Sequence, residues 1–237
     1  FYYHSVAPVP LDPWVLKWLR MELQLFENQM AYLRSKNYRS IFLEEWLAFR
    51  RGIRRSGGKE ICLTFDDGLL DNWVFVYPIA KKYGMRITLF VCPEYVDSRD
   101  IVRPNLENVW SGDCREEDLQ FLGYLSWKEL RLMQESGYVD IQSHTMSHAK
   151  YTASDQLECF YYGGWRGLHP ILNKAPHLKA VYPKDPDFEK ALDNGTPLFE
   201  EKSAVVVRKH TICEAYFEEV AESRNSFDLN EDSQREA

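Results

Sequence analysis

Two clusters of ionisable side chains carry the chemistry that this sequence could perform. Asp66 and Asp67 are adjacent and precede Gly68, while His144 and His148 lie four residues apart. One carboxylate and two imidazoles would provide three oxygen and nitrogen ligands, which leaves the fourth position of a tetrahedral zinc site open for water. Each cluster alone also has a structural interpretation, because Asp-Asp-Gly is a common turn and the two histidines could be ordinary surface residues. Their occurrence together favours metal-dependent hydrolysis.

The spacing within each cluster predicts how its side chains are used. Adjacent side chains on an extended backbone point in opposite directions. We therefore expect one carboxylate to bind a metal ion while its neighbour lies beside a bound water, provided that the chain bends at Gly68. Two histidines four residues apart are expected to share one face of a helical turn and to bind the same ion.

Both clusters are predicted at the carboxyl ends of parallel strands, where loops converge in α/β folds. Residues 60–65 and 138–142 have the apolar pattern of strands and directly precede the clusters, and residues 86–91 have the pattern of another strand. A predicted helix over residues 71–83, closed by Gly84 as its C-cap, connects two of these strands. This order indicates a βαβ unit and a parallel sheet.

Further elements are expected to support these strands. Asp12 and Pro13 predict the start of an amphipathic helix. Ser126 and Glu129 form a capping box that predicts a helix ending at Gly137. The apolar face of the first helix is expected to consist of Leu16, Leu19, Leu23, Phe26, Met30 and Leu33. The remaining predicted elements are short strands at 1–6 and 39–43, a helix at 44–50, an extended piece at 203–208 and a helix at 211–223.

The length of 237 residues fits one α/β domain with insertions. We expect a single domain over residues 1–237, in which 93–124 and 151–210 are insertions or long loops because they show no clear period. Residues 225–237 form a polar tail. The chain begins without Met, so we expect it to be truncated.

Composition excludes several classes of partner and site. The net charge of −7 argues against nucleic acid, whose phosphates are bound by Lys and Arg. No apolar run approaches roughly 18 residues, so no transmembrane segment is predicted. None of the five cysteines has C-x-x-C spacing, and an odd number gives no disulfide framework. A basic cluster before the first acidic pair predicts a solvated turn, with a phosphate or anionic-lipid contact as the alternative; it comprises Arg50, Arg51, Arg54, Arg55 and Lys59.

The two clusters resemble the motifs of a known family. Thr64-Phe65-Asp66-Asp67-Gly68 is similar to the first motif of the polysaccharide deacetylases, carbohydrate esterase family 4 with its NodB-homology domain. Ser143-His144-Thr145-x-x-His148 resembles the second motif. Tyr3-His4-Ser5-Val6 is similar to the opening strand of that family, and residues 125–137 resemble the helix before the histidine motif. The resemblance covers about residues 1–150.

This resemblance implies an α/β fold, specifically a distorted and incomplete (β/α) barrel of the polysaccharide deacetylase type. It implies that Asp67, His144 and His148 bind a divalent metal ion, most often zinc, and that Asp66 is the general base. The implied activity is that of a carbohydrate deacetylase, a hydrolase that removes N-acetyl groups from an amino-sugar polysaccharide or glycoconjugate. Two alternatives stay open: a hydrolase of a small amide or lipid-linked sugar, and an inactive sugar-binding or interaction remnant of the fold.

The later motifs of the family, one of which supplies the general acid, have no convincing match. Val181-Tyr182-Pro183 is a faint similarity to one of them. His169, His177 and His210 are candidate acids by residue type alone. We therefore expect the 237-residue chain by itself to have little or no deacetylase activity. The sequence leaves the sugar, the oligomeric state and the compartment open.

Overall fold

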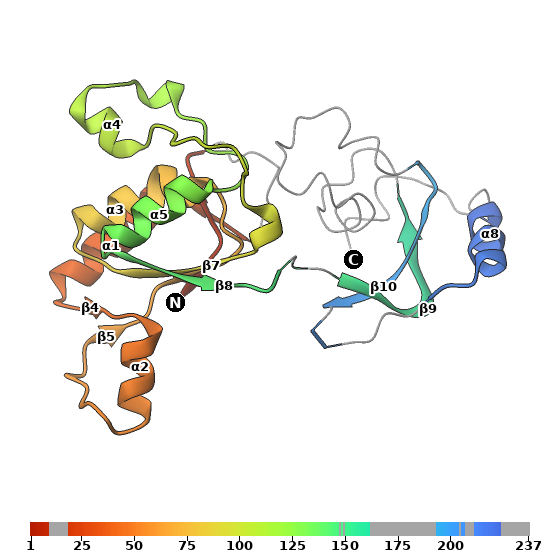
Figure 1. The fold of residues 1–237 in the computed structure, drawn as a ribbon, viewed down its shortest axis with the longest axis horizontal. Coiled ribbons are helices and arrows are strands. Elements are labelled where there is room, and N and C mark those ends of the chain that lie inside the picture. Colours follow the sequence, from red (N-terminus) through yellow and green to blue (C-terminus); the bar gives the residue numbers. More distant parts are fainter. Residues whose placement is uncertain are drawn as a thin grey trace. The chain divides into compact units, whose positions relative to one another are not determined.

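The computed structural model describes residues 1–9, 19–146, 148, 150–161, 193–203, 205–206 and 211–223 (Figure 1). These residues fall into two compact units, and the boundary lies within the second motif. Those up to Met146 belong to the first unit, and those from His148 onward belong to the second. The single domain expected over residues 1–237 stays a prediction, and each unit is described by itself.

The first unit is built on a four-stranded parallel sheet with the order β1-β6-β7-β8. Its strands are β1 (Tyr2–Tyr3), β6 (Thr64–Phe65), β7 (Ile87–Val91) and β8 (Val139–Ser143). The inner strand β7 is apolar except for Thr88 and is largely buried, as expected for a parallel strand covered on both faces. The predicted βαβ unit and parallel sheet are thus confirmed.

Two smaller parallel pairs and several helices complete this unit. The pairs are β2 (Ser5–Ala7) with β3 (Arg20–Glu22), and β4 (Arg39–Ser40) with β5 (Glu60–Ile61). The α-helices are α1 (Leu23–Ser35), α2 (Leu43–Arg50), α3 (Tyr77–Lys82), α4 (Leu106–Ser111) and α5 (Trp127–Glu135). A π-helix, η2 (Asn72–Val76), precedes α3, and two 3₁₀ turns lie at η3 (Pro93–Tyr95) and η4 (Glu116–Asp118).

The core of the first unit lies where α1 covers the start of the sheet. Phe26 of α1 packs edge-on against Phe65 of β6, with ring centroids 5.8 Å apart, and Tyr3 of β1 stacks on Phe65 at 5.0 Å. The predicted capping box of α5 is present, because the Glu129 N–H donates to Ser126 Oγ and the Ser126 N–H donates to Glu129 Oε2. The aromatic contacts hold β6, which precedes the first motif. The capping box holds the start of α5, which leads to β8 and the second motif.

Several predicted elements of the first unit differ in the structure, among them the strand expected over residues 1–6, which is divided into β1 and β2. The helix expected from Asp12 onward begins only at Leu23, because residues 20–22 pair with β2 as a strand; Asp12, Pro13 and Leu16 lie outside the described residues. Glu22 caps α1 instead, since its carboxylate accepts the N–H groups of Gln24 and Leu25. The strand expected over 60–65 is divided into β5 and β6, which pair with different neighbours.

The two segments expected as insertions or long loops also contain regular structure. Residues 93–124 include α4, whose N-cap Asn105 accepts the Glu107 N–H. In the second unit, β9 (Lys150–Phe160) and β10 (Pro197–Ser203) form an antiparallel pair, and α8 (Glu214–Ser223) follows. Phe160, Phe199 and Val220 form a small apolar cluster there. Register shifts in the pair weaken the period of two that would have revealed these strands.

The α/β class and the incomplete arrangement of strands agree with the expected fold. Within the described part of the chain, β1 and β8 are the edges of a four-stranded sheet. In the same part, no helix combines the length and apolarity needed to cross a membrane. None of the five cysteines, all of which lie within the described residues, is part of a disulfide in the structure.

Candidate metal centre

The first acidic pair lies at the carboxyl end of β6, and the backbone turns sharply there. The Asp66 N–H still donates to the carbonyl of Tyr3 on β1 at 3.0 Å. Asp67 then adopts a left-handed conformation with φ +73°, and Gly68 follows with φ +76°. A non-glycine residue rarely adopts this conformation, although Asp tolerates it better than most. The bend therefore begins at Asp67, one residue earlier than expected, and the two carboxylates diverge.

Gly68 is required at this bend for two reasons. Its positive φ disfavours any residue with a Cβ, and a Cβ built there would lie 3.0 Å from Val91 Cγ1 on β7. Its carbonyl accepts the Leu125 N–H at 3.0 Å, which ties the bend to the segment that leads into α5. The close approach of β7 thus fixes the direction in which Asp67 leaves the sheet.

His144 directly follows β8 and is held by the neighbouring strand. Its N–H donates to the Val91 carbonyl at 2.8 Å, and its own carbonyl accepts from Cys92 Sγ at 3.2 Å. The imidazole lies beside Phe90, with ring centroids 6.2 Å apart. These contacts hold the histidine backbone at the same sheet edge as the acidic pair, as the parallel arrangement predicted.

The segment from His144 to His148 is not a helical turn, so that prediction is wrong. Thr145 and His148 have φ values of +69° and +47°, which no right-handed helix permits. The Met146 carbonyl accepts the Glu94 N–H at 3.0 Å, which connects the segment to the turn η3 after β7. A β-branched residue such as Thr145 in a left-handed conformation is strained, and such strain gathers at functional sites.

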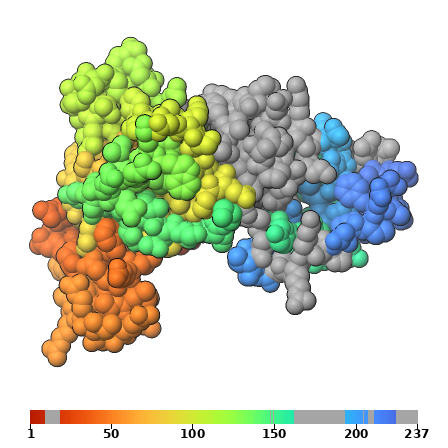
Figure 2. All heavy atoms as spheres, viewed as in Figure 1, coloured from red at the N-terminus to blue at the C-terminus, as the bar shows by residue number. Residues whose placement is uncertain are grey.

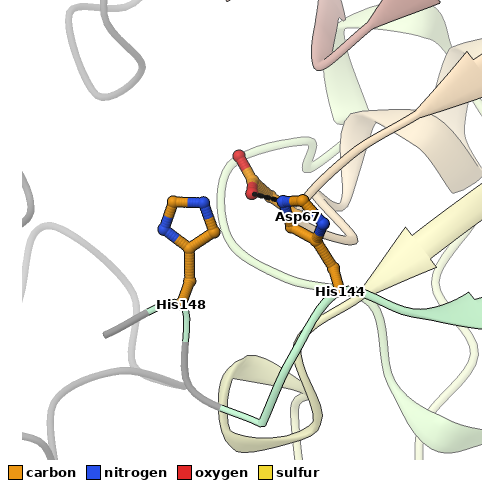
Figure 3. Close-up of side chains that lie close together, drawn as sticks. All are labelled: Asp67, His144 and His148. Carbon is orange, nitrogen blue, oxygen red and sulfur yellow. Dashed lines mark ion pairs between the residues drawn. The ribbon is translucent and has the colours of Figure 1, made fainter. Parts of the chain in front are cut away.

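Asp67, His144 and His148 converge despite the absence of a helix. Each offers one potential ligand atom, and these atoms lie within 4.8 Å of one another. Figure 3 shows the Asp67 carboxylate beside both imidazoles, and Asp67 Oδ1 lies 3.7 Å from His144 Nε2. Zinc–ligand distances of about 2.0–2.2 Å in a tetrahedron require ligand atoms about 3.4 Å apart. The donor set and its spacing therefore fit a divalent metal ion with only small adjustments.

Asp66 lies near a different histidine, which the sequence had not marked as a site residue. Tyr3 pairs with Phe65 in the register of β1 and β6, so the next residues along the two strands, His4 and Asp66, lie opposite each other. His4 Nε2 is 3.8 Å from Asp66 Oδ2. The only signal in the sequence was that His4 and Ser5 are polar residues within the strand expected over residues 1–6.

A buried polar network supports the backbone around His4. Asp71 is fully enclosed and accepts from the Ser5 hydroxyl and from Asn72 Nδ2. Asn72 Nδ2 also donates to the His4 carbonyl at 2.9 Å. Burial raises the pKa of the Asp71 carboxyl to about 8, and the hydrogen bonds from Ser5, Asn72 and the Val6 backbone offset only part of that effect. The residues that follow the first motif thereby hold the strand end that carries His4.

The three histidines that the sequence offered as candidate general acids, His169, His177 and His210, lie outside the described residues. Among the six histidines of the sequence, the described part contains His4, His144 and His148. His4 is therefore the described histidine that is not part of the potential metal site.

Residues 54–159 match the sequence model of the family described as Polysaccharide deacetylase, and this stretch contains both motifs. Over this stretch, the chain is similar to the polysaccharide deacetylase family. This similarity agrees with the resemblance based on Asp66, Asp67, His144 and His148, and it extends into β9 of the second unit.

Curated proteins match the chain over about half of its length. A putative polysaccharide deacetylase, YxkH of Bacillus subtilis, is 25% identical over 130 residues, which is 55% of this chain and 38% of the relative. The poly-beta-1,6-N-acetyl-D-glucosamine N-deacetylase of Staphylococcus aureus is 26% identical over 122 residues, covering 51% and 35%. The matched region thus spans little more than a third of each relative.

Solved structures resemble the chain in part. A de-N-acetylase from Aggregatibacter actinomycetemcomitans superposes with a TM-score of 0.49 at 20% identity, covering 65% of this chain and 57% of that protein. IcaB from Ammonifex degensii gives a TM-score of 0.47 at 23% identity, covering 62% and 53%.

Proposed function

We propose that this chain carries the metal-binding site of an N-deacetylase that hydrolyses N-acetyl groups on an amino-sugar polysaccharide or glycoconjugate. The observation that carries the proposal is the convergence of Asp67, His144 and His148 within 4.8 Å at the carboxyl edge of the sheet. A second carboxylate, Asp66, lies next to this cluster along the chain without belonging to it. This pairing of a ligand set with a separate acid–base residue suits hydrolysis of an amide.

Asp67, His144 and His148 are proposed to hold one divalent cation, with zinc favoured by two imidazole nitrogens and one carboxylate oxygen. When bound, such an ion supplies a Lewis acid that lowers the pKa of water and polarises the acetyl carbonyl. The bend at Asp67 directs this carboxylate away from its neighbour. The cross-strand hydrogen bond of the His144 backbone restricts the second ligand before any ion arrives.

Asp66 is proposed to accept the proton of the attacking water. Its carboxylate lies opposite His4 rather than within the ligand set, with Oδ2 to Nε2 at 3.8 Å. An amine can leave the tetrahedral centre only if it is protonated, so the reaction also needs a proton donor. We assign this role to His4, since an imidazole can carry a proton near neutral pH and this one faces the general base.

The substrate class rests on the relatives. The Staphylococcus aureus relative is named for poly-beta-1,6-N-acetyl-D-glucosamine, which makes β-1,6-linked N-acetylglucosamine oligomers the first substrate to test. A small amide or a single lipid-linked sugar is the alternative substrate. An inactive sugar-binding remnant would bind the oligomer and release no acetate.

The experiment is an acetate-release assay on this chain and on a form extended at its C-terminus. Each is assayed after chelation and again after zinc is restored, beside the Asp66→Asn variant. The control is Asp100→Asn, because Asp100 is an exposed carboxylate that pairs with Lys128. We expect zinc-dependent acetate release in at least one of the two forms, which Asp66→Asn lowers by about 10²–10⁴-fold and Asp100→Asn preserves. Release that is unaffected by chelation, or oligomer binding without any release in both forms, would refute the proposal.

A further inference from the structure

A projecting part of the first unit carries basic and apolar side chains that the proposed hydrolysis does not use. It consists of α2 and the loop that follows it, which extend away from the four-stranded sheet (Figures 1 and 2). Helix α2 contains no fully buried residue, and every residue from 51 to 59 is exposed. We call its exposed arginines and large apolar residues the α2 patch; they are Trp46, Leu47, Arg50, Arg51, Ile53, Arg54 and Arg55.

The charge of this patch is opposite to that of the whole chain. Residues 50–59 contain four arginines and one lysine and no acidic residue, whereas the chain has a net charge of −7. Arg54 Nη1 lies 3.7 Å from Glu45 Oε1. Within the described residues, no ion pair is found for Arg51 or Arg55. The patch therefore has cationic groups available for an external anion.

The apolar side chains of the patch are exposed beside these arginines. Ile53 is 71% exposed, and Trp46 and Leu47 are 44% and 42% exposed. The loop folds back onto the helix end, because the N–H groups of Ile53 and Arg54 both donate to the Ala48 carbonyl. Trp46 lies under the Arg50 guanidinium, 5.7 Å from the ring centroid. Basic and apolar groups thus share the free end of α2.

A hollow beside α2 does not suit a single phosphate group. It has a volume of about 310 Å³ and is lined by Ile41, Trp46, Phe49, Arg50, Ser56, Glu60 and Cys62. Hydrogen bonds from the Ser56 hydroxyl and from the Gly57 and Gly58 N–H groups lower the pKa of the Glu60 carboxyl to about 2, so a negative charge remains in the hollow. Arg39 Nη2 lies 3.5 Å from Glu60 Oε1, so this cation beside the hollow already has a carboxylate partner. The outer arginines remain for an external anion.

We infer that the α2 patch docks on an anionic lipid surface, with the arginines at the headgroups and Ile53, Trp46 and Leu47 in the boundary with the acyl chains. A soluble phosphate or polyanion would require the arginines alone and would leave the exposed apolar groups in water. A lipid surface would contact both the arginines and the exposed apolar side chains, since interfacial segments combine a basic face with Trp and aliphatic residues. The inference is independent of the proposed deacetylation.

Vesicle sedimentation tests this docking directly. The 237-residue chain is mixed with vesicles of phosphatidylcholine, and with vesicles that also contain phosphatidylglycerol, at low and high salt. We expect binding to the anionic vesicles only, and weaker binding at high salt. The double variant Arg51→Gln/Arg55→Gln should lower the partition coefficient by about 25-fold, at about fivefold for each arginine. Ile53→Ser should lower it by about tenfold.

The matched control is Lys128→Gln/Arg131→Gln, which removes two positive charges from the exposed side of α5. We expect this variant to bind the vesicles as the unmodified chain does. An equal loss of binding in the control would show a response to net charge and would overturn the proposal. Retained binding in Ile53→Ser, together with competition by inorganic phosphate, would show a soluble-anion contact and would also overturn it. Equal binding to the neutral and the anionic vesicles would also overturn the proposal.

Discussion

The imidazole of His4 and the carboxylate of Asp66 lie opposite each other at the ends of two adjacent parallel strands, with Nε2 and Oδ2 3.8 Å apart. The register of β1 and β6 produces this relationship, because the preceding pair is Tyr3 with Phe65. Asp67 then turns away towards His144. A single bend therefore separates two adjacent carboxylates into an acid–base position and a ligand position.

Replacing each carboxylate by its amide should separate these two roles. We expect Asp66→Asn to lose about 10²–10⁴-fold in the rate of acetate release and to keep its metal, because an amide cannot accept a proton. Asp67→Asn should instead bind the metal more weakly. Metal content by elemental analysis, measured beside acetate release, distinguishes the two variants. Equal loss of metal in both would show that the division of roles is wrong.

His4→Gln tests the assignment of the proton donor. Glutamine retains hydrogen-bonding capacity but cannot carry the proton, so we expect kcat to fall by about 10²–10⁴-fold while metal content stays unchanged. An activated acetate ester with a leaving group that needs no proton should be hydrolysed at a nearly normal rate. If the variant loses both substrates equally, His4 has a structural role and the acid lies elsewhere in the protein.

The sequence predicted the sheet around the site well, because short apolar runs bounded by turn residues determine β7 and β8 locally. It could not predict the division of residues 60–65, since β5 and β6 are distinguished only by their pairing partners, β4 and β1. The left-handed conformations of Thr145 and His148 were missed for a similar reason. The H-x-x-x-H spacing fits a helical turn equally well, and only tertiary hydrogen bonds such as that between Glu94 and Met146 select the irregular path.

His4 was not predicted as a site residue, although a simple rule places it opposite Asp66 once β1 and β6 are known to pair. A histidine and an aspartate that each end a strand will meet if the strands are parallel neighbours in register. The sequence gives no direct information on which strands are neighbours, because β1 and β6 are separated by about sixty residues of other structure. Non-local pairing is therefore the information that only the folded chain supplied.

Gly68→Ala should destabilise the first unit more than the same change at a glycine whose added Cβ would meet no neighbouring atom. The left-handed φ costs about 1–2 kcal/mol with a Cβ, and the approach to Val91 Cγ1 adds about 1–3 kcal/mol. Gly112→Ala is the control, because Gly112 also has a positive φ of +85° but has no atom within 4 Å of a built Cβ. Chemical denaturation gives the two free energies of unfolding. A loss at Gly68 no larger than at Gly112 would contradict the close approach of β7.

The buried carboxyl of Asp71 should make stability depend on pH. Its pKa is raised from 3.8 to about 8 in the folded chain, so the folded state retains a proton that the unfolded state releases. The stabilisation from this proton is complete below the unfolded pKa and is lost as pH rises from there through about 8. The slope is at most about 1.4 kcal/mol per pH unit. Asp71→Asn should remove this slope, as unfolding curves across the window will show; parallel pH profiles for both proteins would exclude the assignment.

The central claim is that Asp67, His144 and His148 hold one divalent ion, and metal stoichiometry tests it most directly. The chain is stripped with chelator, reloaded with zinc and analysed for bound metal, together with His144→Gln, His148→Gln and His4→Gln. The account predicts one tightly bound ion in the unmodified chain and in His4→Gln, and strongly weakened binding in the other two variants. Undiminished zinc in both His144→Gln and His148→Gln would contradict it.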